Sequence, residues 1–225
     1  MRFHDRQHAG QLLGAKLEHL RASNPIVLGL TRGGIPVASE VARILGAPLD
    51  LIVVRKMIAL DAPESAVGAI AEGGDTFLVP ETLRDARVSE QQAAALADRE
   101  VAELARRVRL YRDEIPAPRI AGRTAIVVDD FLETGATARA AARAARKRGA
   151  ARVVLAVPVL RGGTEGDLRH DLDELVSIVV TPPGRALTDS YEHLADVSDE
   201  EAIALLRRAR AEWTAHAETR PGSST

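Results

Sequence analysis

The chain has 225 residues, of which 46% are hydrophobic, and this is enough to bury a core and to form one domain. Its 30 basic and 32 acidic side chains nearly cancel, which argues against nucleic acid or a membrane surface as a partner. There is no cysteine for disulfides, thiolate metal sites or thiol catalysis, and no signal sequence or apolar run near about 18 residues, so we expect a cytoplasmic protein.

Short apolar runs rich in Val, Ile and Leu recur along the chain, and uniformly apolar runs are typical of parallel strands that are buried on both faces. They cover residues 26–30, 49–54, 124–128, 152–160 and 175–180. Helical patterns separate several of them, including one that ends at Gly46 and one that ends at Gly149 after a basic turn. This alternation predicts an α/β fold with an open, mainly parallel sheet flanked by helices.

Two further helices are predicted from capping boxes. Ser89 and Gln92 open a helix with an apolar stripe that we expect to pack on the sheet rather than to form a dimer seam. The members of this stripe are Ala94, Ala97, Val101, Leu104, Val108 and Tyr111. Ser198 and Glu201 open the last helix, whose stripe contains Ala202, Leu205, Leu206, Ala209 and Trp213. We therefore predict a domain over residues 1–213 and a disordered tail over 214–225.

The loop after residues 124–128 combines two acidic residues with a phosphate-sized turn. Ligands of open α/β sheets bind beyond the carboxyl ends of the strands. The free amides of the helix that follows, with Gly135 and the hydroxyls of Thr134 and Thr137, would bind a phosphate monoester. Asp129 and Asp130 would then lie near ribose hydroxyls, where magnesium could bridge the oxygens.

Two alternatives to this interpretation are simpler. In the first, either aspartate caps the helix and Gly135 serves only the turn. In the second, the sequence VVDD ends the first strand of a phosphate-receiver domain. The acidic pair lies past the middle of the chain, however, and the later strands end in PVL and VVTPP without the third aspartate that a receiver needs.

The stretch AIVVDDFLETGAT, residues 125–137, resembles the phosphoribosyl-diphosphate (PRPP) binding motif of type I phosphoribosyltransferases. The resemblance continues in LGLTRGGIPVASEVARILGAPLDLIVVRK and AVGAIAEGG, and more weakly in YEHLADVSDEEA, so it covers most of the chain from Ile26 to about Leu206. It is greatest to a bacterial subgroup whose acceptor base is undefined. It implies the type I phosphoribosyltransferase fold, with a small hood over the sheet.

The resemblance also assigns roles to individual residues. It implies that the 5′-phosphate of PRPP is bound by Glu133, Thr134, Gly135, Ala136 and Thr137. The pyrophosphate group would be bound by Thr31, Arg32, Gly33 and Gly34, in a loop that often has a cis peptide bond, and by Lys56, which would reach it from the second strand. It implies that the catalytic residues are Arg32, Lys56, Asp129 and Asp130, and that the last two hold Mg²⁺ directly or through ribose hydroxyls or water. Taken alone, Arg32 and Lys56 could equally be solvated surface charges.

Two segments in the resemblance carry fewer signals. Residues from Met57 to Val67 correspond to a flexible loop that closes over the active site, and here the glycine- and asparagine-containing stretch of the subgroup is replaced. Residues 181–196 correspond to the hood, where Tyr191 would stack on a base or act as a half-buried anchor. The histidines show no spacing that predicts a metal site; they are His4, His8, His19, His170, His193 and His216.

The predicted function is transfer of the 5-phosphoribosyl group from PRPP to a nitrogen nucleophile, expected to be a nucleobase, with release of pyrophosphate. The alternative is a regulator on the same fold that senses PRPP or binds nucleic acid without transferring anything. A homodimer is an open alternative to a monomer.

Overall fold

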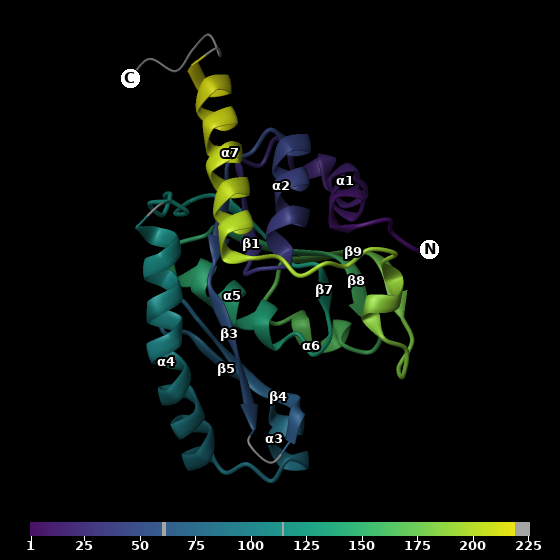
Figure 1. The fold of residues 1–225 in the computed structure, drawn as a ribbon, viewed down its shortest axis with the longest axis vertical. Helices are drawn as coiled ribbons and strands as arrows, with labels where there is room; N and C mark the ends of the chain where they lie inside the picture. Colours follow the sequence, from purple (N-terminus) through teal and green to yellow (C-terminus); the bar gives the residue numbers. More distant parts are fainter. Residues whose placement is uncertain (60–61, 114, 219–225) are drawn as a thin grey trace.

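The computed structural model describes residues 1–59, 62–113 and 115–218. Two β-sheets and the helices around them make up this part of the chain, as Figure 1 shows. The strands are β1 (Pro25–Leu30), β2 (Leu49–Ile52), β3 (Val54–Ala59), β4 (Ala62–Ala71), β5 (Thr76–Leu78), β6 (Thr124–Val128), β7 (Phe131–Leu132), β8 (Arg152–Arg161) and β9 (Glu174–Thr181). The α-helices are α1 (Arg6–Lys16), α2 (Gly34–Leu45), α3 (Pro80–Asp85), α4 (Glu90–Arg112), α5 (Ala136–Lys147), α6 (Glu165–Leu168) and α7 (Asp199–Glu218), and the 3₁₀ turns are η1 (Glu18–Leu20) and η2 (Leu187–Ser190).

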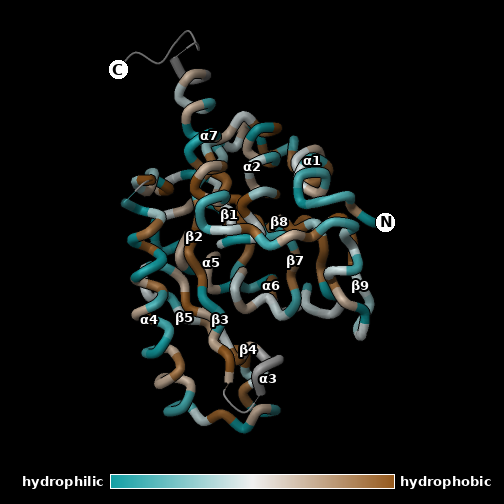
Figure 2. Tube along the Cα trace, in the orientation of Figure 1, coloured by the Kyte–Doolittle hydropathy of each residue, from teal (hydrophilic) through white to brown (hydrophobic). Residues whose placement is uncertain are grey.

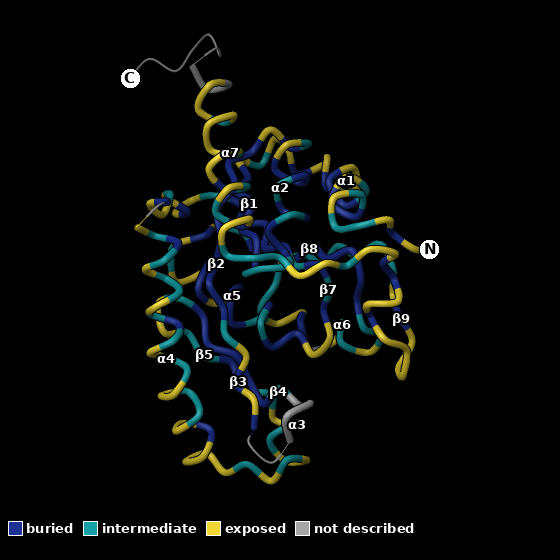
Figure 3. Tube along the Cα trace, viewed as in Figure 1, coloured by how far each residue is buried: buried dark blue, intermediate teal, exposed yellow. Residues whose placement is uncertain are grey.

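The larger sheet is parallel throughout and confirms the predicted fold class. Its strands follow the order β2-β1-β6-β8, and β8 also pairs with β7 and β9. The side chains of its central strands alternate between two buried clusters. Val127 in β6 packs with α5 on one face, whereas Val128 packs with α1, α2 and α7 on the other face. Figures 2 and 3 show that the central strands are both apolar and buried, as strands covered on both faces should be.

One of the five predicted strands is divided in the structure. The run over residues 49–54 supplies β2, but the chain enters a second sheet at Val54, where β3, β4 and β5 pair antiparallel in that order. The predicted flexible loop from Met57 to Val67 consequently corresponds to the end of β3 and the start of β4, with residues 60–61 outside the described ones. Met57, Ala59 and Val67 are buried against α4, and this packing favours strands over a loop.

Helix α4 has the predicted capping box and a more divided environment than we expected. The Ser89 hydroxyl accepts from the Gln92 amide, and the Gln92 side chain accepts from the Ser89 amide. Leu104 and Tyr111 pack in the cluster beneath the parallel sheet, whereas Ala97 packs on the β3–β4 sheet. Val101 is 46% exposed, so the predicted stripe is not continuous. The helix therefore connects the two sheets, and Figure 1 shows it alongside both.

Helix α7 begins at the second predicted capping box and is longer than expected. The amide of Glu201 donates to the Ser198 hydroxyl at 3.1 Å. On the inner face of the helix, Ala202 and Leu206 are fully buried. The helix continues past residue 213 to Glu218, and residues 219–225 lie outside the described ones.

The N-terminal segment pairs with the region expected to form the hood. Phe3 bridges to Tyr191, and both rings are buried in a small cluster with Leu187. Three backbone hydrogen bonds join residues 3–4 to residues 190–193. The two ends of the domain are thereby connected beside the carboxyl ends of the parallel strands.

Candidate active site

A cavity of about 400 Å³ lies where the carboxyl ends of β1 and β6 meet the second sheet. It brings together residues that are nearly a hundred positions apart in the sequence. The predicted site residues that line it are Thr31, Arg32, Gly33, Lys56, Asp129, Asp130, Glu133, Thr134, Gly135 and Thr137. Gly34, Ala136 and Tyr191 lie outside its lining, and the first two occupy the starts of α2 and α5.

Two glycines allow the loop after β1 to approach the acidic pair. A Cβ atom on Gly33 would lie 2.2 Å from Oδ2 of Asp130, and one on Gly34 would lie 2.5 Å from the carbonyl oxygen of Val128. Neither position has room for a side chain. The Thr31–Arg32 peptide bond in this loop is cis. The glycines are therefore required by the packing of the loop on the end of β6.

The two aspartates have different surroundings although they are adjacent. Asp130 is 6% exposed, and its Oδ2 accepts from Arg6 at 2.9 Å (Nε) and 2.8 Å (Nη2). Asp129 borders the cavity, where part of its surface is open, and protein atoms enclose its other sides. Burial, and then the neighbouring charge of Asp130, raise the pKa of Asp129 well above its ordinary value, against the opposing effect of Lys56. Among the described residues, no ion pair of Asp129 is found, so its carboxylate lacks the direct cationic partner that Asp130 has.

Arg6 is a site residue that the sequence analysis missed. It begins α1, lines the cavity, and donates to the carbonyl oxygen of Ala195 at 2.5 Å as well as to Asp130. No motif marks this arginine, because it lies 124 positions from its partner. Only the pairing of the N-terminal segment with residues 190–193 brings it to the end of β6.

The turn that precedes α5 has the form of an anion site. Gly135 has a φ of 77°, and a Cβ atom there would lie 2.8 Å from the Leu168 side chain, so glycine is required. Thr134 is exposed, and both it and Thr137 border the cavity. Backbone amides at the start of a helix attract negative charge, since they have no partner within the helix. Glu133 is also exposed and pairs with Arg161 at 3.3 Å, at the end of β8.

Two cationic side chains border the cavity without a close carboxylate partner among the described residues. Lys56 is exposed on β3, and no ion pair of this lysine is found within the described residues. Lys56 and Ile58 alternate along β3 with Met57 and Ala59, which pack on α4. Lys56 and Ile58 border the cavity, as Arg55 also does. Arg32 is 38% exposed in its side chain, and its nearest carboxylate is Asp199 at 3.9 Å. Both cations remain available to an anionic ligand.

Tyr191 occupies a different environment from the one expected of a base-stacking residue. Its ring is 2% exposed and lies 5.4 Å from the Phe3 ring, centroid to centroid. Its hydroxyl donates to the backbone carbonyl of Asp130 at 2.6 Å. The second interpretation, an anchor, fits this position, although the ring is almost fully buried. The aromatic side chain that lines the cavity is Phe131, which the sequence analysis did not consider.

A parallel sheet with an acidic pair, a phosphate-sized turn and a basic loop at one edge is typical of α/β proteins that bind phosphorylated ligands. The family pattern of the phosphoribosyl transferase domain matches residues 4–186, and the chain belongs to that family. This match confirms the resemblance on which the site residues were assigned.

Two relatives match most of the chain. The chain is 40% identical to TT1426 from Thermus thermophilus, whose crystal structure superimposes with a TM-score of 0.77 over 92% of this chain and 99% of that one. It is 39% identical, over 94% of its own length, to Rv0571c of Mycobacterium tuberculosis, whose name provisionally assigns it to the phosphoribosyl transferases. The chain spans 48% of the length of that relative.

A third relative matches over a shorter stretch. The bifunctional protein PyrR of Chloroflexus aurantiacus is 40% identical over 43% of this chain and 63% of its own.

Within the described residues, no helix is both long and apolar enough to cross a membrane.

Proposed function

We propose that the protein transfers the 5-phosphoribosyl group of PRPP to a nitrogen nucleophile, with release of pyrophosphate. The observation that supports this most directly is the shared cavity. Asp129, the turn at Thr134 and the cations Arg32 and Lys56 all border it. Phosphate, ribose and pyrophosphate are the three parts of PRPP, and each has a chemically matched neighbour there.

The roles follow from the charges that develop during the reaction. As the bond at carbon 1 of the ribose breaks, the ring becomes positive and the pyrophosphate becomes more negative. Arg32 and Lys56 stabilise the leaving group, and Asp129 stabilises the cationic ring and orients its hydroxyls. Asp130 contributes to the same negative charge, and the guanidinium of Arg6 holds its carboxylate in position. The reaction needs no covalent nucleophile, because positioning and electrostatics lower its barrier.

The acidic pair also fits the magnesium ion that the family implies. Mg²⁺ prefers oxygen ligands, and Asp129 has a raised pKa and a surface open to the cavity, so a cation beside it would relieve the repulsion from Asp130. Oδ2 of Asp130 already accepts from Arg6, which makes Asp129 the better ligand of the two. Bound there, Mg²⁺ would neutralise part of the charge on the phosphate oxygens.

The acceptor site is proposed for the side of the cavity bordered by Phe131, Asp196 and Val197. Phe131 is partly exposed and lines the cavity, so its ring is the proposed stacking partner of a planar base. The carboxylate of Asp196, from the segment expected to form the hood, could accept a hydrogen bond from a ring nitrogen or an exocyclic amine. A nitrogen heterocycle is therefore the proposed acceptor class.

Two measurements test the proposal. Binding of PRPP with Mg²⁺ should raise the melting temperature, and ribose 5-phosphate should raise it less, since it leaves Arg32 and Lys56 without a partner. Pyrophosphate release should then be measured with PRPP, Mg²⁺ and a panel of nucleobases. Equal melting shifts for the two sugar phosphates would contradict the pyrophosphate assignment. Strong PRPP binding without release for any base would favour the PRPP-sensing alternative instead.

A further inference from the structure

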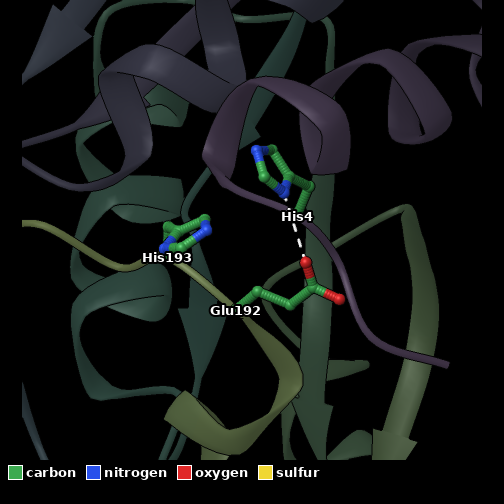
Figure 4. Close-up of side chains that lie close together, drawn as sticks. All are labelled: His4, Glu192 and His193. Carbon is green, nitrogen blue, oxygen red and sulfur yellow. Dashed lines mark hydrogen bonds and ion pairs between the residues drawn. The ribbon is translucent and has the colours of Figure 1, made fainter.

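We infer that His4, Glu192 and His193 form a binding site for a divalent transition-metal ion, with Zn²⁺ as the best match. Figure 4 shows these side chains gathered where the N-terminal segment crosses residues 192–193. One ligand atom from each lies within 4.8 Å of the others. The site is separate from the acidic pair and does not depend on the proposed transferase function.

The backbone holds the three ligands in place although their side chains are exposed. The amide of Glu192 donates to the carbonyl oxygen of Phe3 at 2.8 Å, and the amide of His193 donates to that of His4 at 2.9 Å. The buried rings of Phe3 and Tyr191, which immediately precede His4 and Glu192, anchor the two segments. Because the backbone of the ligand residues is already ordered, the entropy lost on binding a metal would come mainly from their side chains.

The side chains are already close to the geometry that a metal would need. His4 Nδ1 lies 3.2 Å from Oε2 of Glu192, and the two imidazole rings are 4.8 Å apart, centroid to centroid, in an edge arrangement. Ligand bonds of about 2.1 Å in a tetrahedron place the ligand atoms about 3.4 Å apart. The side chain of His4 is 60% exposed and that of Glu192 is 49% exposed, so both are free to make this small adjustment.

The donor types select the metal. Two imidazole nitrogens and one carboxylate, with a fourth position open to water, match the ligand sets of zinc sites. Mg²⁺ and Ca²⁺ prefer oxygen ligands alone and would favour the acidic pair in the cavity. Arg2 is the neighbouring cation in the N-terminal segment, and its Nε is held on the carbonyl oxygen of Tyr191 at 3.1 Å, which leaves the carboxylate of Glu192 to His4.

A metal at this site would join the two ends of the domain beside the cavity. His4 and Glu192 are 188 positions apart, and Arg6 follows His4 by two residues. The bound ion would therefore fix the segment that positions Arg6 against Asp130. Melting temperature is a second readout of binding, since an ion that binds only the folded chain stabilises it.

Zinc binding by the full chain without a histidine tag tests the inference. Isothermal titration of the metal-free protein should show one strong Zn²⁺ site that excess Mg²⁺ does not displace. His4→Gln and His193→Gln should each weaken it by about tenfold or more, and Glu192→Gln by less. The matched control is His19→Gln, because His19 pairs with Glu174 at 2.9 Å in a similarly exposed position but has no third ligand among the described residues.

The variants must be folded for the comparison to count, so their melting temperatures are measured first in a chelator. The zinc-induced rise in melting temperature should disappear in His193→Gln and remain in His19→Gln. X-ray absorption at the zinc edge should show two imidazole ligands. Unchanged zinc affinity in both His4→Gln and His193→Gln, or no binding by the parent chain at micromolar zinc, would overturn the inference.

Discussion

Asparagine substitutions at Asp129 and Asp130 should change the stability of the protein in opposite directions. Asp130 is buried and paired with Arg6, whose side chain is 13% exposed. Asparagine keeps one acceptor for the guanidinium but removes the charge, so Asp130→Asn should lower the free energy of unfolding by about 1–3 kcal/mol. Asp129 forms no ion pair among the described residues, and Asp129→Asn removes the repulsion from Asp130 and the cost of burying its charge.

The stability that Asp129→Asn gains over wild type should increase with pH. Because the pKa of Asp129 is raised in the folded state, the folded protein binds its proton more tightly than the unfolded chain does. Wild-type stability therefore falls as the pH rises from the ordinary aspartate pKa through the folded one. The difference between variant and wild type should grow over that window by at most about 1.4 kcal/mol per pH unit. Solvent in the cavity reduces this, and we expect a gain of about 1 kcal/mol at neutral pH.

Denaturant unfolding of the metal-free proteins at several pH values measures these effects, and PRPP titration with Mg²⁺ measures function. Both variants should lose PRPP affinity by about tenfold or more, since an amide neutralises neither a cation nor a developing positive ribose. A helix-cap role predicts nearly unchanged stability in both asparagine variants, since asparagine caps a helix about as well as aspartate, with PRPP binding intact. An Asp129→Asn protein that is less stable than wild type at neutral pH, or that binds PRPP normally, would refute the reasoning.

Substitution of Lys56 or Arg32 by alanine should weaken PRPP binding by about tenfold to a hundredfold and leave nucleoside monophosphate binding nearly unchanged, which two titrations would compare. Joint loss of both ligands would instead indicate damage to the fold. Gly34→Ala places a methyl group 2.5 Å from a carbonyl oxygen of β6, so denaturant unfolding should show a loss of about 1–3 kcal/mol together with weaker PRPP binding. Tyr191→Phe removes the 2.6 Å hydrogen bond to the Asp130 carbonyl and should cost about 1–3 kcal/mol of stability. Acceptor binding, measured on the same Tyr191 variant, should change little, and a selective loss of base affinity would restore the stacking interpretation.

Much of the fold was predictable because its signals are local. A strand buried on both faces needs a continuous apolar run, and each run from Pro25–Leu30 to Glu174–Thr181 contributes to the parallel sheet. The last run forms β9, which is only partly buried, so its apolar sequence overstated its burial. Helix ends are also determined within a few residues. Gly46 ends α2 in the left-handed conformation that glycine favours, and the boxes at Ser89 and Ser198 begin α4 and α7.

The second sheet was not predictable in the same way. Residues 54–71 have short, mixed runs, and their strands form because Met57, Ala59 and Val67 find apolar partners on α4, a helix that follows them in the sequence. β-propensity depends on such neighbours more than on the strand itself. Lys56 was expected to reach the pyrophosphate from the second strand of the parallel sheet, but it lies on β3 of the second sheet.

The sequence by itself determined the family of this protein and most of the groups that border its cavity, because a phosphate-binding turn and an acidic pair at the end of a strand are contiguous. Only the tertiary structure decided which distant residues complete that region. Arg6 donates to the carboxylate of Asp130, and the hydroxyl of the buried Tyr191 donates to the backbone carbonyl of Asp130. The rings of His4 and His193 are in contact. All three contacts depend on the pairing of the two ends of the domain. The physical reason is that such contacts depend on chain crossings between segments about 190 positions apart, which local spacing does not encode.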